Sequence, residues 1–123
     1  MSIDLALPGP DTPVIDESRL MAEFGGDLEI LAELRDLFLE HAPPLFETIK
    51  QGMIDEDLEV LARDAHSLKG ACATYGAPRL AMVCKAIELS AKNNDWQDLN
   101  GIRDQFEKEY DLVFEALRGM NVG

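Results

Sequence analysis

Three residues that lie close together in the sequence, His66, Lys69 and Gly70, have the types and spacing most suited to chemistry. An imidazole is largely neutral near pH 7 and keeps one nitrogen lone pair free, so it can act as a nucleophile with little activation. In a helix, the residues three and four positions after a histidine lie next to its ring. Lys69 would place a positive charge there, and Gly70 would leave the space beside the ring empty. The pattern favours a nucleophilic histidine that a bulky partner, or a phosphoryl group carried by that partner, can approach.

The segment around His66 has the apolar spacing of an amphipathic helix. Between residues 57 and 73, apolar residues recur every three or four positions, namely Leu58, Leu61, Ala62, Ala65, Leu68 and Cys72. At about 100° per residue, His66 lies on the shoulder of this face, where a ring can touch the core and still expose a nitrogen. A glycine inside a helix costs about 1 kcal/mol relative to alanine. Gly70 therefore indicates either room for a bulky partner or close packing of a neighbouring helix.

The composition favours one domain with a protein partner. The chain has 123 residues and a formal net charge of −13, which would repel the phosphates of nucleic acid. No apolar run approaches the ~18 residues of a membrane span, and the N-terminus lacks the features of a secretory signal. We expect a cytoplasmic monomer that binds neither nucleic acid nor membranes. Cys72 and Cys84 occupy apolar helix positions, which predicts buried, reduced thiols.

The apolar periodicity predicts an all-α domain over residues 14–123, preceded by a flexible tail over residues 1–13, where prolines prevent regular structure. The expected helices run from a cap at Asp16 to residue 24, from residue 28 to Gly52, from Asp55 or Asp57 to residue 75, over residues 78–92, and over an apolar stripe from residue 99 to an end at residue 119. Short connections between four long helices predict an antiparallel up-down-up-down four-helix bundle, with the short N-terminal helix over one end.

Some further residues need separate interpretation. Prolines remove a helix donor and clash with the preceding turn, so we expect a kink or a restart near Ala42, just before Pro43 and Pro44. His41 has no lysine and glycine beside it, which favours a structural role. Trp96 and Tyr110 are expected in the core or at its rim.

The run from Ala65 to Glu88, AHSLKGACATYGAPRLAMVCKAIE, resembles the signature of the histidine-containing phosphotransfer (HPt) family of two-component phosphorelays. The resemblance includes the AHSLKG core and the spacing of the residues that follow it, Gly76, Leu80, Cys84 and the pair Ile87-Glu88. Upstream, VIDESRLMAEFGGD and FLEHAPPLF resemble the first helix and the kinked second helix of the family. The resemblance covers roughly residues 14–94.

The resemblance implies a phosphoryl carrier and not a kinase. Family members accept the group from the aspartyl phosphate of a receiver domain, or from a hybrid sensor histidine kinase, and pass it to the aspartate of a response regulator. It implies that His66 is the acceptor through Nε2, that Lys69 compensates the charge and that Gly70 provides clearance. No cofactor is expected on this chain, because the magnesium ion belongs to the receiver. Glu88 is a candidate for orienting the other ring nitrogen.

The same resemblance implies a docking surface around His66, because receivers of this family bind largely through an apolar patch beside the histidine. The apolar candidates here are Ala62, Leu68, Ala73 and Tyr75. Arg63 and Lys85 are expected to flank the site, with Glu88 beside them, as a locally basic spot on an acidic protein.

Other classes of function fit the sequence less well than a phosphoryl carrier does. The sequence has no glycine-rich phosphate loop for a kinase, no glutamate three residues before either histidine for a di-iron bundle, and no zinc-ligand spacing. Two alternatives stay open: an HPt-like helical adaptor that binds a kinase or receiver without phosphorylation, and the phosphotransfer module of a larger kinase. Lys69 and Gly70 beside His66 favour the carrier over the adaptor.

Overall fold

The computed structural model describes residues 12–119, and this part of the chain consists of helices joined by turns. The helices are α1 (Glu17–Phe24), α2 (Leu28–Asp55), α3 (Leu58–Tyr75), α4 (Pro78–Lys92) and α5 (Trp96–Gly119). The predicted all-α class is therefore confirmed for residues 12–119. None of these helices is long and apolar enough to cross a membrane. The predicted tail over residues 1–13 lies outside the described residues, except for its last two positions.

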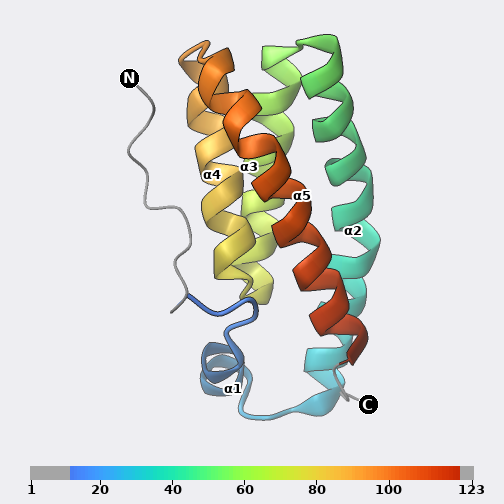
Figure 1. The fold of residues 1–123 in the computed structure, drawn as a ribbon. Helices are drawn as coiled ribbons and strands as arrows, with labels where there is room; N and C mark the ends of the chain where they lie inside the picture. The colour runs from blue at the N-terminus through green and yellow to red at the C-terminus, as the bar shows by residue number, and fades with distance from the viewer. Residues whose placement is uncertain (1–11, 120–123) are drawn as a thin grey trace.

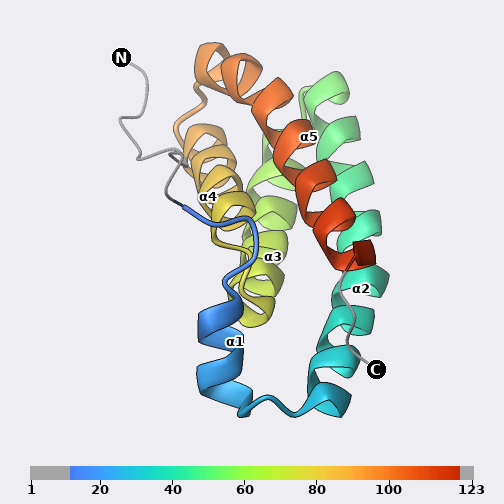
Figure 2. The ribbon, with the colours of Figure 1, turned by 60° about the horizontal axis from the view of Figure 1, so that its bottom comes forward.

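The four long helices lie side by side, and the chain reverses direction at each connection between them (Figure 1). Helix α3 packs against α2 and α4, while α5 packs against α4 and also contacts α2. The short helix α1 lies at the end of the bundle where α3 turns into α4 (Figure 2). There Asp16 N donates to Gly76 O at 2.8 Å, and the buried Leu20 packs over the turn. Helix α3 is thus supported by neighbours on two sides, with its remaining face open.

Aspartates and glycines set most of the helix ends, as the sequence predicts. The carboxylates of Asp16, Asp27 and Asp57 accept hydrogen bonds from free backbone N–H groups at the starts of α1, α2 and α3. Gly25 and Gly76 end α1 and α3 with φ values of 60° and 94°, a left-handed conformation that glycine adopts without steric cost. Of the two aspartates considered for the start of α3, the structure uses Asp57.

The prediction that Gly52 ends α2 is wrong. The helix ends at Asp55 and is capped by Glu56, which has φ 56° and whose N–H bonds to Gly52 O. A Cβ at Gly52 would lie 3.1 Å from Leu61 Cδ2, closer than ordinary van der Waals contact. This glycine therefore serves the close approach of α2 to α3, and the sequence cannot separate that role from a helix stop.

Of the kink or restart expected near Ala42, the restart does not occur, because helix α2 is continuous through Pro43 and Pro44. Prolines remove donors from the helix, but the apolar face of α2 continues on both sides of them. Ala42 is fully buried and Phe46, one turn later, is 7% exposed. Packing of this face against α3 and α5 stabilises the helix across the prolines.

Aromatic rings and one buried ion pair join α5 to the rest of the bundle. Tyr110 stacks on Phe46 with ring centroids 3.7 Å apart, which confirms a core position for Tyr110, and Trp96 is partly buried at the rim. Arg79, near the start of α4, donates from Nε and Nη2 to the two carboxylate oxygens of the fully buried Glu109. Cys72 and Cys84 are free thiols in the core, as predicted.

Candidate functional site

His66 stands on the exposed shoulder of α3, with 66% of its side chain accessible to solvent. Its neighbours in sequence explain the position: Ala65 and Leu68 are fully buried and fix the helix face that points to the core. The ring lies about 100° around the helix from that face and stays at the surface. The structure thus confirms that this histidine is accessible and belongs to α3.

Glu88 of α4 lies beneath the ring and holds three donors. Its Oε2 is 3.0 Å from His66 Nδ1 and 2.9 Å from Lys92 Nζ, and its Oε1 is 2.7 Å from Lys69 Nζ. Glu88 is only 4% exposed, so the carboxylate is almost entirely removed from solvent and satisfied by these partners. The expected contact between Glu88 and the ring is therefore present, and Lys69 reaches the site through the same carboxylate.

The ionisation of Glu88 decides which nitrogen of His66 carries the proton. Burial opposes the charged form of the carboxyl group, but the hydrogen bonds from Lys69 and Lys92 outweigh it and lower the pKa of Glu88 to about 2. An ionised carboxylate can only accept, so the Nδ1 of His66 must be the donor. In a neutral ring, Nε2 then keeps its lone pair, and within the described residues the hydrogen bond of His66 is made by Nδ1 alone. The geometry prepares Nε2 as the nucleophile.

The lowered pKa of Glu88 predicts a pH-dependent contribution to stability. A carboxyl group with a pKa of 4.5 when unfolded and about 2 when folded stabilises the fold above about pH 4.5, by about 3 kcal/mol, and this contribution is lost as the pH falls towards 2. Urea unfolding of wild type and Glu88→Gln should therefore differ by up to about 3 kcal/mol at neutral pH and converge in acid. A difference that stays constant with pH would contradict this account.

Gly70 lies one turn after His66, is exposed, and has open space where a side chain would stand. Among residues 12–119, a Cβ built on it meets nothing within 4 Å outside its own helix backbone. Of the two explanations left open by the sequence, close packing of a neighbouring helix is therefore excluded. The open surface next to the ring agrees with clearance for an incoming group.

Several cationic side chains lie near the ring of His66, but they are not all the ones that the sequence predicts. Arg63 and Ala62 line a shallow hollow that also contains His66 and Lys92. The Nε of Arg63 donates to Asp64 Oδ1 at 2.9 Å, while 65% of the Arg63 side chain stays exposed. Lys85 is exposed on α4 and is not among the residues that line this hollow. Lys92 does line the hollow, one helical turn after Glu88, and sequence reasoning missed it.

The apolar residues expected on the docking surface are only partly there. Leu68 is fully buried, so it cannot be a surface contact. It belongs to the core-facing stripe of α3, which explains the error. Tyr75 is 2% exposed and reaches the surface only as a lining residue of the groove between α2 and α3. Ala62 is half-buried at the hollow around His66, and Ala73 is exposed. Glu88 is also too buried for docking.

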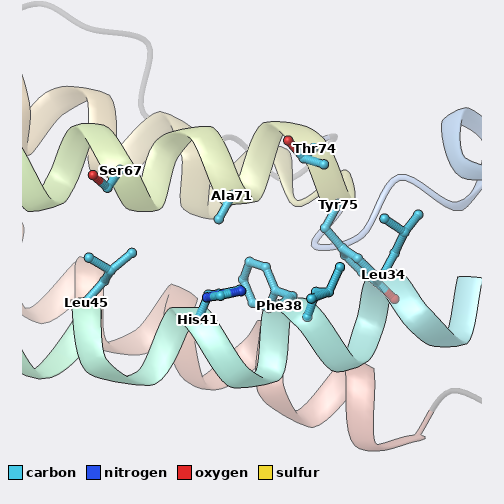
Figure 3. A pocket seen from close by; sticks show the side chains of 9 residues that line it. Leu34, Phe38, His41, Leu45, Ser67, Ala71, Thr74 and Tyr75 are labelled. Atoms are coloured by element: carbon cyan, nitrogen blue, oxygen red, sulfur yellow. The ribbon is translucent and has the colours of Figure 1, made fainter.

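An apolar groove between α2 and α3 begins beside His66 and was not predicted. Figure 3 shows residues of α2 facing residues of α3 across it. The lining residues are Leu34, Leu37, Phe38, His41, Leu45, Ser67, Ala71, Thr74 and Tyr75. Ser67 lines both this groove and the hollow around His66, so the two are adjacent. Leu37 is 50% exposed, and His41 is an exposed residue of the groove and not a core residue.

This helical bundle carries an exposed histidine whose Nδ1 is fixed by a buried carboxylate, with cationic side chains nearby. These features define a class of protein suited to carrying a group on Nε2. The family model for the Hpt domain matches residues 33–116, which include α3, α4 and most of α2 and α5. The chain belongs to the Hpt family, whose members are phosphocarriers of phosphorelays that interact with receiver domains and kinases. No curated protein and no solved structure matches the chain.

Proposed function

We propose that this protein accepts a phosphoryl group on Nε2 of His66 from the aspartyl phosphate of a receiver domain or hybrid kinase, and passes it to the aspartate of a response regulator. The observation that supports this most directly is the contact between Nδ1 of the exposed ring and the ionised Oε2 of Glu88, at 3.0 Å. It favours the tautomer with a free lone pair on Nε2.

In the proposed step, the lone pair of Nε2 attacks the phosphorus atom of the aspartyl phosphate. The Nε2–P bond forms, the P–O bond to the aspartate breaks, and the aspartate leaves as a carboxylate. No proton has to leave the ring: Nδ1 keeps its hydrogen, and the positive charge that develops on the ring lies 3.0 Å from the carboxylate of Glu88. The reverse attack by a second aspartate returns the ring to its neutral form.

The surroundings of His66 suit a receiver domain as partner. The phosphoryl group brings about two negative charges, and Lys69, Lys92 and Arg63 lie around the ring on a protein whose net charge is −13. The α2–α3 groove offers an apolar surface next to the site, and the half-exposed Leu37 is one of the residues that line it. A receiver that docks over this groove brings its aspartyl phosphate to Nε2.

In this proposal the chain acts as a monomer in the cytoplasm and holds no cofactor of its own. The magnesium ion that receiver chemistry requires stays with the receiver. The chain supplies the nucleophile, the charge compensation and the docking surface, and it has no kinase activity.

The proposal is tested by incubating the chain with a panel of receiver domains from the same organism, each carrying ³²P on its aspartate. We expect transfer from at least one receiver to give a label that is stable in alkali and labile in acid, as a phosphoramidate bond requires. Binding without transfer, measured by titration against the same panel, would instead support the phosphorylation-independent adaptor.

A further inference from the structure

Lys92, the last residue of α4, is bound to the same carboxylate oxygen as the ring of His66. Its Nζ lies 2.9 Å from Glu88 Oε2, and His66 Nδ1 lies 3.0 Å from that atom. Lys69 occupies the other oxygen at 2.7 Å. The two lysines therefore hold different places: Lys69 has Oε1 to itself, whereas Lys92 shares Oε2 with the ring.

The two lysines also differ in exposure. The side chain of Lys69 is 31% exposed, and that of Lys92 is 57% exposed. Lys92 also lines the hollow in which His66 stands, while Lys69 does not. A long, exposed side chain with one hydrogen bond can change partners at little cost. Lys92 is thus the cation that can most easily move within the site.

Charge counting shows why a second cation matters. Glu88 carries one negative charge and the two lysines carry two positive charges, so the cluster with a neutral ring has one surplus positive charge. A phosphoryl group adds about two negative charges close by. When Nε2 carries that group, the ring becomes positive and its Nδ1–H bond to Oε2 strengthens. Lys92, which shares that oxygen, is then the partner most easily released from it.

We infer that Lys92 is a second phosphoryl-binding cation, which is held on Oε2 of Glu88 in the free protein and turns to the phosphoryl group when His66 is phosphorylated. The inference rests on the proposed function of His66. It places a mobile phosphoryl-binding cation, Lys92, on α4, in addition to Lys69 on α3.

The test uses the full chain phosphorylated chemically with phosphoramidate, so that no receiver is needed. The Nε2–P bond forms as the P–N bond of the reagent breaks and ammonia leaves. The ³¹P signal is then followed through the last protonation of the phosphoryl group, because a cation bound to it lowers the midpoint pH. In Lys92→Met the midpoint should rise by about half a pH unit, while Lys92→Arg should stay near wild type. Lys108→Met, which removes the same charge from an exposed position on α5, is the matched control.

A second measurement compares the equilibrium share of label between the chain and a receiver. Lys92→Met should lower the share held by the chain threefold to tenfold, with Lys108→Met unchanged. The ¹⁵N shifts of His66 in the unphosphorylated variant should still show the Nδ1–H tautomer, because Lys69 keeps Glu88 in place. An unchanged ³¹P midpoint in Lys92→Met, or loss of the tautomer, would overturn the inference. If wild type takes no label from any receiver, the proposed function fails, while the ³¹P titration still decides the role of Lys92.

Discussion

His66→Gln is expected to take up no phosphoryl label from a receiver that labels the wild-type chain. The substitution removes the only atom proposed to form a bond with phosphorus, and glutamine has no lone pair of comparable nucleophilicity. The fold should persist, because 66% of the His66 side chain is exposed and the helix face beneath it is fixed by the buried Ala65 and Leu68. The measurement is ³²P transfer under conditions in which wild type is labelled to completion.

The control for this variant is binding. His66→Gln should bind the same receiver with a Kd within a few-fold of wild type, since the α2–α3 groove and the cations around the site are retained. The chain has 2 histidines, so a label that persists in the variant and maps to His41 would move the acceptor to the groove and contradict the assignment. If the variant loses both receiver binding and labelling, the missing label reflects a loss of docking and says nothing about the chemical role of His66.

The parts of this site that the sequence predicts are those set by local spacing on one helix. The position of His66 on the shoulder of α3 follows from the apolar residues before and after it. The same spacing places Leu68 at the centre of the buried face. The sequence pattern therefore already argued against Leu68 as a docking residue. For Gly70 the sequence left two explanations, and only the open space around its Cα decides between them.

The contacts between helices could not be predicted, because they depend on how α4 is rotated against α3. Glu88 is buried next to the equally buried Ile87, although a glutamate at such a position usually lies in water. Helix α4 packs against both α3 and α5, so its buried face is wider than its apolar stripe. The lysines that compensate the charge of Glu88 come from two helices. Lys92 can be recognised as a residue of the site only once the burial of Glu88 is known.

The α2–α3 groove could not be predicted from the sequence either. Its apolar residues on α2 resemble ordinary core positions, and some of them, such as Phe38, are 3% exposed. Others, such as Leu37, are half-exposed, and α3 contributes small side chains such as Ala71 to the facing wall of the groove. A groove arises from the combination of large residues on one helix with small ones on the other, and periodicity along one helix does not contain that information.

Gly70→Gln is expected to slow transfer from a phosphorylated receiver at least tenfold while making the chain slightly more stable. A Cβ at this position meets nothing within 4 Å, so the substitution fits the fold, and glutamine is better than glycine in a helix by roughly 0.5–1 kcal/mol. The new side chain lies one turn from His66 and occupies the space through which the aspartyl phosphate approaches Nε2. Small errors in the placement of reacting atoms cost about a hundredfold in rate, so partial obstruction is enough.

Two variants separate obstruction from any general effect of losing a glycine. Gly101→Gln changes an exposed glycine of α5 that also has nothing within 4 Å of a Cβ, and it should gain similar stability with unchanged transfer. Gly70→Ala adds only the Cβ and should transfer at close to the wild-type rate. Stopped-flow transfer rates and urea unfolding of the three variants provide the comparison. Normal rates in Gly70→Gln would mean that the receiver reaches Nε2 from another side, and the clearance role of Gly70 would have to be abandoned.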